Sequence, residues 1–242
     1  MKNLIHVLGA IVVSLTSISA QATETGQNAT VVELFTSQGC YTCPAADALL
    51  GKLITSRPEV IALEFHVDYW DDLVYGSAGV WKDPYSKAKY SDRQRRYNSL
   101  GPAGRRGVYT PQMMINGRYA LVGTDRDDLY TSLRRAENTP LQLSVLDQGA
   151  DWKLEIAGNA SQAGNVWRVD YLRFAETPVP SGENKGKSLQ NHNIVTSMTE
   201  VAQWQNGVDS LILSAIAPEQ EFGCAILVQS NDGRLLGAAH CP

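Results

Sequence analysis

The fold is decided by the stretch Phe35-Thr36-Ser37-Gln38-Gly39-Cys40-Tyr41-Thr42-Cys43-Pro44-Ala45-Ala46, in which two cysteines are separated by two residues. A β-branched run over residues 30–35 leads into it, and a helix-favouring segment over residues 45–54 follows. A cysteine at a helix N-terminus lies among unpaired N–H groups at the positive end of the helix dipole, which favour a thiolate. The pattern therefore predicts Cys40 as a nucleophile. Cys43, one helical turn further along, is placed to attack a mixed disulfide on Cys40.

The residues after this helix extend the pattern into a parallel sheet. Residues 60–67 predict a second strand, and a strand–helix–strand order implies a right-handed crossover. Helices are predicted over residues 86–100 and 125–137, and Asn116-Gly117 predicts a two-residue hairpin turn. Pro111 comes just before the first strand of that hairpin, where proline is ordinarily excluded because it has no N–H to donate. We therefore expect a local role for Pro111.

The first 22 residues have the pattern of a secretory signal peptide. Lys2 supplies a positive charge, residues 4–13 form an apolar core, and Ala20-Gln21-Ala22 is a small-x-small cleavage site. The apolar core is too short to cross a bilayer, and no later segment approaches the length of about 18 apolar residues that spanning requires. We therefore expect signal peptide 1–22 to be removed and the mature chain to be periplasmic or secreted, with no membrane span.

Composition and charge are those of an ordinary globular protein. The 242 residues carry a formal net charge of −4 and are 43% hydrophobic. No global basic field points to nucleic acid or anionic lipid as a partner. No phosphate loop or dinucleotide fingerprint is present, so no cofactor is expected. A local basic cluster comprises Arg93, Arg95, Arg96, Arg105 and Arg106. It is either a solvated face or a docking surface for an acidic partner.

The second half of the chain has a different pattern. After Thr139-Pro140, short runs of alternating apolar and polar residues are separated by turn residues. This pattern predicts a smaller all-β, sandwich-like domain over residues 139–242, following an α/β domain over residues 23–138. A polar Pro/Gly-rich loop over residues 177–193 is long enough to be either functional or mobile.

An even number of cysteines in an exported chain suggests disulfide pairs. The spacings of the four cysteines favour Cys40 with Cys43 and Cys224 with Cys241. If Asp232-Gly233 forms a two-residue turn, Cys224 faces Cys241 across the last predicted hairpin. A cross-strand disulfide needs facing Cβ atoms in this way, so this second pair is predicted to be structural.

Several motifs along the chain occur together in one known family. They are Glu33-Leu34-Phe35-Thr36-Ser37-Gln38-Gly39-Cys40 with Cys43-Pro44, Phe65-His66-Val67-Asp68-Tyr69-Trp70, Trp81-Lys82-Asp83-Pro84, Val108-Tyr109-Thr110-Pro111-Gln112-Met113, and Gly182-Glu183-Asn184-Lys185-Gly186-Lys187-Ser188-Leu189 with His192-Asn193-Ile194-Val195. Together they resemble the secreted thioredoxin-like family catalogued as domain of unknown function 1223. The resemblance covers nearly the whole mature chain. It implies an α/β thioredoxin-like domain followed by a smaller β-rich domain, and it implies little about the substrate.

Likeness to the thioredoxin superfamily implies roles for four residues. Cys40 would be the attacking thiolate and Cys43 the resolving thiol. Pro111 would be a cis-proline beside the cysteines, leaving the preceding backbone free to pair with an extended substrate. Glu33 would be the buried acid that accepts a proton from the resolving cysteine, although its spacing to Cys40 is one residue longer than in thioredoxin. A partly exposed strand position is the alternative for Glu33.

A metal site is the main alternative chemistry. His66 and Asp68 lie at the end of the second predicted strand, and Met113 and Met114 follow the proline of the hairpin. Two thiolates, an imidazole and a thioether could together bind a soft metal such as Cu(I). The ordinary alternatives are a hydrogen-bonded core histidine and methionines that fill a strand core.

These patterns lead to one principal functional prediction. The chain is expected to be an exported thiol–disulfide oxidoreductase that uses Cys40 and Cys43 on the thiols or disulfides of exported proteins, with a separate redox partner. The alternative is a non-catalytic protein that binds a partner or Cu(I) on the same scaffold, with the two cysteines as a structural disulfide or as ligands.

Overall fold

A computed structural model describes residues 29–74, 76–100, 107–136, 139–207, 209–215 and 220–242. The predicted signal peptide, together with Arg105 and Arg106 of the basic cluster, lies outside the described residues. The first half contains β1 (Val31–Thr36), α1 (Cys43–Ser56), β2 (Ile61–His66), a short 3-10 helix η1 (Gly76–Ala78), α2 (Ala88–Ser99), β3 (Gln112–Ile115), β4 (Tyr119–Val122) and α3 (Arg126–Arg135). The second half contains β5 (Leu141–Asp147), β6 (Asp151–Gly158), β7 (Gly164–Pro178), β8 (Ser188–Trp204), β9 (Asp209–Ser214), β10 (Phe222–Ser230) and β11 (Leu235–His240).

The β1–α1–β2 unit has the predicted parallel arrangement. β1 and β2 pair in parallel along their whole length. α1 begins at Cys43, and Pro44 stands in its first turn, where an N–H would have no partner within the helix. Ala46, Leu50 and Leu53 are buried at spacings of four and three residues, so one face of α1 packs on the sheet. The two cysteines are thereby fixed at the edge where β1 ends and α1 starts.

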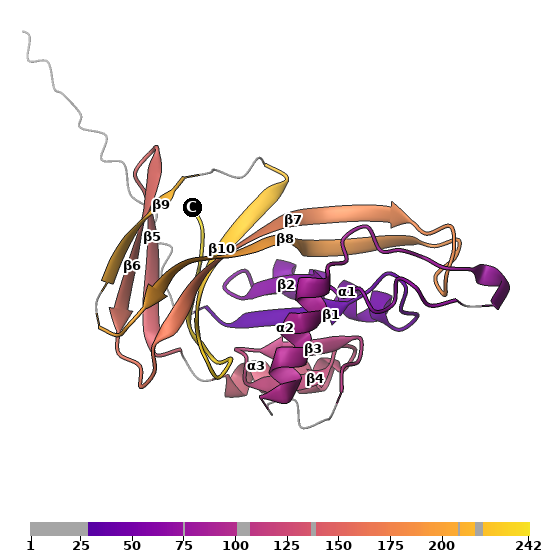
Figure 1. The fold of residues 1–242 in the computed structure, drawn as a ribbon, viewed down its shortest axis with the longest axis horizontal. Coiled ribbons are helices and arrows are strands. Elements are labelled where there is room, and N and C mark those ends of the chain that lie inside the picture. Colours follow the sequence, from indigo (N-terminus) through magenta and orange to yellow (C-terminus); the bar gives the residue numbers. More distant parts are fainter. Residues whose placement is uncertain (1–28, 75, 101–106, 137–138, 208, 216–219) are drawn as a thin grey trace, which may run out of the picture.

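One large mixed sheet includes strands from both halves of the chain (Figure 1). Its eight strands follow the order β11-β10-β7-β8-β2-β1-β3-β4. β8 joins β2 in parallel where Ile194 lies opposite Glu64. β5, β6 and β9 form a separate three-stranded sheet. The predicted α/β character of the fold is confirmed. The second half is not a separate all-β unit as predicted, because β7, β8, β10 and β11 belong to the same sheet as β1 and β2. The pairing of β8 with β2 is a long-range contact that local strand patterns do not reveal.

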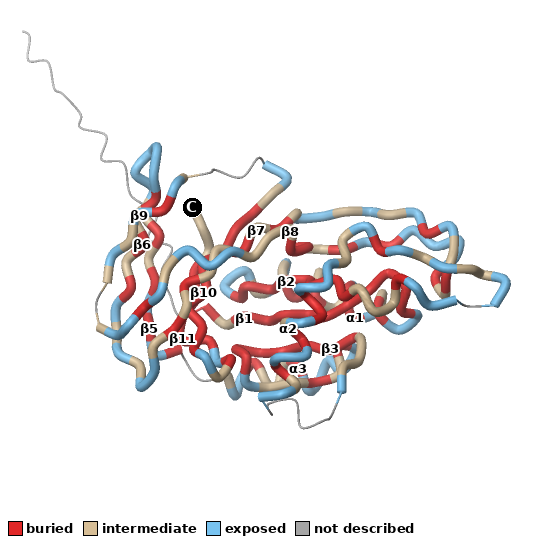
Figure 2. The backbone as a smooth tube through the Cα atoms, viewed as in Figure 1, coloured by how far each residue is buried: buried red, intermediate tan, exposed pale blue. Residues whose placement is uncertain are grey.

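The buried hydrophobic residues of the described ranges form three clusters. Figure 2 marks the buried positions along the backbone in red. One face of the large sheet packs on α1 and α3 through residues such as Leu34 and Leu50. The other face packs on α2, where the rings of Phe65 and Tyr90 meet edge to face with centroids 5.3 Å apart. The three-stranded sheet packs on β7, β10 and β11 around Trp152. Because the two faces of the large sheet pack on different helices, successive residues of β1 point toward different helical layers.

The hairpin between β3 and β4 differs from its prediction by one residue. Ile115 pairs with Tyr119, which leaves three residues in the loop instead of two. Asn116 and Gly117 both have positive φ values, 49° and 62°, as the sequence pattern requires. Gly117 lies against the turn that follows β10, because a Cβ at this position would be 2.0 Å from the carbonyl oxygen of Gly233. The two turns therefore pack against each other, and the close contact requires glycine.

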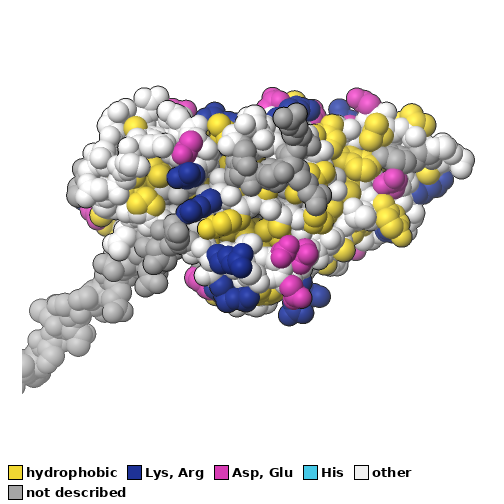
Figure 3. All heavy atoms as spheres, turned by 90° about the horizontal axis from the view of Figure 1, so that it is seen from below, with side chains coloured by type: hydrophobic (Ala, Val, Ile, Leu, Met, Phe, Trp, Pro, Cys, Tyr) yellow, Lys and Arg dark blue, Asp and Glu magenta, His cyan; other side chains and the backbone are white. Residues whose placement is uncertain are grey.

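Charged side chains of both signs share the molecular surface. On the face shown in Figure 3, groups of Lys and Arg side chains and groups of Asp and Glu side chains both occur, with hydrophobic side chains between them. Within the basic cluster, Arg95 pairs with exposed Asp92 at 2.8 Å, and Arg96 donates to the carbonyl oxygen of Asn231 at 3.0 Å. Arg93 instead reaches the interior, where it pairs with Glu33. None of the helices in the described ranges is long and apolar enough to cross a membrane.

Candidate functional site

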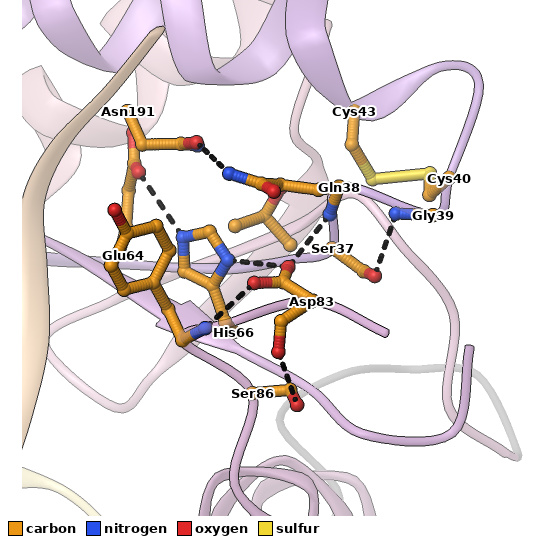
Figure 4. Close-up of polar contacts among 12 residues, drawn as sticks. Ser37, Gln38, Gly39, Cys40, Cys43, Glu64, His66, Asp83, Ser86 and Asn191 are labelled. Atoms are coloured by element: carbon orange, nitrogen blue, oxygen red, sulfur yellow. Dashed lines mark hydrogen bonds and ion pairs between the residues drawn. A yellow bond between two sulfur atoms is a disulfide. The ribbon is translucent and has the colours of Figure 1, made fainter. Parts of the chain in front are cut away.

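The two cysteines of the Cys-x-x-Cys motif form a buried disulfide at the start of α1 (Figure 4). The Cα atoms of Cys40 and Cys43 are 5.4 Å apart, and the two residues are 1% and 0% exposed. Thr42 Oγ1 lies 3.5 Å from Cys40 Sγ. A thiolate released at Cys40 would therefore meet a hydroxyl group and the positive end of the helix dipole, both of which favour the charged form.

The loop before the disulfide is fixed by backbone hydrogen bonds. Cys40 N–H donates to the carbonyl oxygen of Ser37 at 3.1 Å, and Gly39 N–H donates to Ser37 Oγ at 3.1 Å. Gln38 N–H donates to Asp83 Oδ2 at 2.8 Å, across 45 positions of sequence. The position of Cys40 thus depends on a carboxylate from the irregular segment that follows β2.

A buried histidine lies between two carboxylates next to this loop (Figure 4). His66 Nδ1 is 2.7 Å from Asp83 Oδ2, and His66 Nε2 is 3.5 Å from Glu64 Oε2. Burial opposes a charge on His66, but the two carboxylates outweigh it and raise the pKa of His66 to about 10. Burial also favours a neutral Asp83, yet the charge of His66 and its hydrogen bond lower the pKa of Asp83. His66 is therefore a buried cation at neutral pH.

Helix α1 contributes a further buried acid, Asp47. It lies four residues after Cys43, and residues four apart share one helix face. Asp47 Oδ1 accepts a hydrogen bond from Thr36 Oγ1 at 2.7 Å. Burial, and next the charge of Glu64, raise the pKa of Asp47 well above its usual value, although the hydrogen bond from Thr36 opposes this shift. A titratable group thus stands one helical turn from Cys43.

Glu33 is buried, but on the opposite side of β1 from α1. It accepts hydrogen bonds from Arg93 Nε at 2.6 Å and from the hydroxyl of Tyr97 at 2.5 Å, both on α2. The next residue, Leu34, packs in the cluster that contains α1. A shift of one residue along a strand moves a side chain to the other face of the sheet, and the extra residue between Glu33 and the cysteines has this effect. The structure therefore does not bring Glu33 to Cys43, and Glu33 is not partly exposed either.

Pro111 directly precedes β3, the strand next to β1, and its segment is linked to the cysteine loop through Trp70. The peptide bond between Thr110 and Pro111 is cis, as predicted. Thr110 Oγ1 accepts a hydrogen bond from Trp70 Nε1 at 2.8 Å. Trp70 also packs on Gly39, because a Cβ at Gly39 would lie 3.1 Å from Trp70 Cβ. One aromatic side chain thus ties the Thr110-Pro111 segment to the residue before Cys40.

The candidate metal ligands have separate partners. His66 is held by two carboxylates, and Asp68 Oδ1 accepts a hydrogen bond from Ser91 Oγ at 2.5 Å. Met113 packs in the cluster around α1, whereas Met114 packs in the cluster around α2. In the part of the chain that the structure describes, no group of three or more His, Cys, Asp and Glu residues is arranged to hold a metal ion. These side chains therefore do not converge on the two sulfur atoms.

The second disulfide lies far along the sheet, at the last hairpin. Cys224 and Cys241 are bonded with Cα atoms 5.3 Å apart, and Cys241 N–H donates to the carbonyl oxygen of Cys224 at 3.0 Å. β10 and β11 pair in the predicted register from Ala225 opposite His240, and a bulge between Val228 and Gln229 shifts it near the turn. Both cysteines pack in the cluster between the two sheets.

The loop between β7 and β8 covers the first disulfide. Asn184 Nδ2 donates to the carbonyl oxygens of Gln38 and Cys40, at 2.8 Å and 3.0 Å. Glu183 Oε2 accepts a hydrogen bond from Tyr41 N–H at 2.8 Å. This part of the predicted polar loop therefore lies directly against the backbone that carries Cys40.

Three buried polar residues of the site, Asp47, Glu64 and Asn191, were not predicted as site residues from the sequence. Asn191 on β8 accepts a hydrogen bond from Gln38 Nε2 at 2.9 Å. The only local signal for Asp47 is its spacing of four residues from Cys43, which places it on the buried face of α1. Asn191 has no local signal, because its role depends on the pairing of β8 with β2. Asp83 and Asn184 lie within motifs that carry the family resemblance.

Comparison with known proteins bears out the family resemblance. A family model described as "Protein of unknown function (DUF1223)" matches residues 31–229. The X-ray crystal structure of protein AGR_C_4864 from Agrobacterium tumefaciens, a structural genomics target, is similar with a TM-score of 0.72 and 30% sequence identity. The similarity covers 92% of this chain and 96% of that chain. No curated protein matched the sequence. The family match includes the first disulfide, the buried His66 cluster and the loop between β7 and β8.

Proposed function

This chain belongs to the DUF1223 family, and we propose from its site that it is an exported thiol–disulfide oxidoreductase acting through Cys40 and Cys43. The observation that carries the proposal is the disulfide at the N-terminus of α1, one turn from a buried acid of raised pKa. The order of elements supports a thioredoxin-like scaffold for the first half. A parallel β1–α1–β2 unit is followed by the β3–β4 hairpin, which comes directly after Pro111, and by the closing helix α3.

The proposed exchange moves two electrons between sulfur atoms. In the reducing direction, the Cys40 thiolate attacks a substrate disulfide, so a mixed disulfide forms on Cys40 and one substrate thiolate leaves. The Cys43 thiol then loses its proton, and its sulfur attacks Cys40 Sγ. The Cys40–Cys43 bond forms, the second substrate thiolate leaves, and the substrate is reduced. The reverse sequence oxidises a substrate dithiol.

Asp47 is the residue best placed to accept the proton from Cys43. It shares a helix face with Cys43, whereas Glu33 lies on the other side of the sheet and is paired with Arg93. Burial and the charge of Glu64 raise the pKa of Asp47, and a carboxylate of raised pKa is a stronger proton acceptor when it is ionised. The charge of His66 and the hydrogen bond from Thr36 both support its ionised form.

The proposed substrates follow from the expected compartment. The signal pattern of residues 1–22 supports export to a place where disulfides form and persist. The partners would be thiols or disulfides of exported proteins, and a separate redox protein would restore the starting state of Cys40 and Cys43. The exchange needs no bound cofactor, because the electrons come from and return to sulfur.

A second candidate function is supported by the burial of the disulfide. Cys40 is 1% exposed and Cys43 is 0% exposed, as expected for a structural bond in a non-catalytic, partner-binding protein. In that case the bond would persist under mild reductants and would form no adducts with other proteins.

Trapping of mixed disulfides separates the two functions. With Cys43→Ser, an adduct formed on Cys40 has no resolving thiol and should accumulate in cell envelope extracts, to be released by dithiothreitol. The double variant Cys40→Ser, Cys43→Ser is the matched control and should form none. If the single variant forms no more adducts than the double variant, exchange is not the function and the structural reading stands.

A further inference from the structure

A short segment between β7 and β8 closes over the redox site. This cap segment, residues 179–187, is held at its base, where Val179 N–H donates to the carbonyl oxygen of Lys187 at 2.9 Å. It is also anchored at its middle, where Gly182 N–H donates to the carbonyl oxygen of Ala78 at 2.9 Å. The cap segment is therefore an ordered element with its own hydrogen bonds.

The cap segment limits access to Cys40. Asn184 is completely buried, and its amide group bridges the carbonyl oxygens of Gln38 and Cys40. Because Cys40 is only 1% exposed, a protein substrate cannot reach its sulfur atom while these hydrogen bonds are formed. The proposed exchange thus requires the cap segment to move.

Glu183 places a carboxylate on the backbone of the residue that follows Cys40. Its Oε2 atom lies 2.8 Å from the backbone nitrogen of Tyr41, the residue that follows Cys40. Like charges near one another oppose ionisation, so this carboxylate disfavours a thiolate at Cys40 while the cap segment is closed. In the disulfide state Cys40 carries no charge, so the same contact causes no charge repulsion.

The other charged groups around Cys40 are balanced by partners. Asp83 is paired with His66, and Asp47 accepts a hydrogen bond from a buried hydroxyl. Lys187 Nζ donates to Asn184 Oδ1 at 2.8 Å and lies 4.6 Å from the centroid of the Tyr41 ring. The positive charge of Lys187 therefore favours a thiolate at Cys40, whereas the negative charge of Glu183 disfavours it. Removing one or the other charge should shift the acidity of the Cys40 thiol in opposite directions.

We propose that Glu183 is a positioning residue that couples the redox state of Cys40 and Cys43 to closure of the cap segment. The inference rests on the proposed function, because it concerns access to the same dithiol. Closure disfavours the Cys40 thiolate, and by reciprocity the thiolate disfavours closure. The disulfide form is thus closed, and reduction opens the cap segment so that the thiolate becomes accessible to a substrate.

Two measurements on purified protein test this coupling. In Glu183→Gln, we expect the acid dissociation constant of the Cys40 thiol to rise roughly tenfold. This constant is measured from the ultraviolet absorbance of the thiolate as a function of pH. The equilibrium constant for reduction of the Cys40–Cys43 disulfide by glutathione should rise by up to the same factor. This corresponds to a change of about 30 mV in the reduction potential. Lys187→Gln should shift both quantities the other way. Glu200→Gln, an exposed carboxylate near the far end of β8, is the matched control and should leave both unchanged.

Hydrogen exchange of residues 179–187 tests the reverse direction of the coupling. In the unaltered protein, reduction should increase amide exchange in the cap segment, and Glu183→Gln should diminish that increase. The coupling is overturned if Glu183→Gln changes neither thiol acidity nor the redox dependence of exchange. These measurements need no substrate. The expected effects of Glu183→Gln can therefore be absent while Cys43→Ser still traps adducts, so the coupling and the proposed function are tested separately.

Discussion

Asp83 Oδ2 lies 2.7 Å from His66 Nδ1, and the same oxygen accepts Gln38 N–H at 2.8 Å. One carboxylate oxygen therefore joins a buried cation to the loop that carries Cys40. Asp83 comes from an irregular segment, and the contact explains why that segment is held beside the end of β1. The local structure around the disulfide thus depends on a charge pair that is shielded from water.

The His66–Asp83 pair predicts a pH dependence of stability. The folded-state pKa of His66, about 10, lies above its ordinary value of 6.5. Its contribution to the free energy of unfolding is therefore complete below about pH 6.5 and is lost as the pH rises toward 10. Urea unfolding across this range should show decreasing stability, by at most about 1.4 kcal/mol per pH unit for this one group.

The variant Asp83→Asn identifies the origin of that dependence. Removing one partner of a buried ion pair costs about 3 to 5 kcal/mol. We expect a loss of this order at pH 6.5 and a shallower decline between pH 6.5 and 10. An unchanged pH profile in Asp83→Asn would show that His66 does not owe its charge to Asp83.

Asp47→Asn should slow the second step of exchange and spare the first. Loss of a proton acceptor typically costs at least about a hundredfold in rate. Release of a mixed disulfide from Cys40 should slow by about this factor, with a change in its pH profile, while formation of the adduct keeps its rate. Asp127→Asn, an exposed site in the first turn of α3, is the control. Equal release rates in both variants would remove Asp47 from the mechanism.

Glu33→Gln should affect folding and leave the redox chemistry intact. The substitution leaves the largely buried Arg93 guanidinium without its carboxylate, which should cost up to about 3 to 5 kcal/mol in urea unfolding. The pH profile of disulfide release should match that of the unaltered protein, because Glu33 faces α2. A shifted profile with unchanged stability would instead assign Glu33 the role of proton acceptor.

The second disulfide should contribute stability only. Replacing Cys224 and Cys241 together by serine opens a link across 17 positions, which the chain-entropy model values at about 3 kcal/mol. The redox equilibrium of Cys40 and Cys43 should stay the same, because the second pair lies at the last hairpin of the sheet. A changed equilibrium would indicate that the two disulfides exchange electrons.

The sequence predicted the local part of this site well. The strand, the Cys-x-x-Cys loop and the start of α1 depend on neighbouring residues and on apolar spacing, and all three appear where the pattern places them. The longer spacing between Glu33 and Cys40 was visible in the sequence, but the face of β1 on which Glu33 lies was not. A single extra residue reverses the direction of a strand side chain only if the strand register stays the same, and the register is set by tertiary contacts.

The remaining parts of the site depend on long-range contacts. Glu183 reaches Tyr41 across 142 positions, and Asn191 reaches Gln38 across 153. Asn191 is on β8, which pairs with β2, and Glu183 is in the segment that leads into β8. Hydrophobic periodicity identifies a strand without identifying its neighbour. The polar loop after β7 was recognisable, but its place over the cysteines was not.

The most direct test of the account is the redox equilibrium of each disulfide in the folded protein. The protein would be equilibrated with glutathione buffers, and its free thiols alkylated and located by peptide mass spectrometry. We expect Cys40 and Cys43 to be reduced and reoxidised reversibly while Cys224 and Cys241 stay bonded. If Cys40 and Cys43 become alkylated only when the protein unfolds, the bond does not turn over, and the proposed oxidoreductase function is wrong.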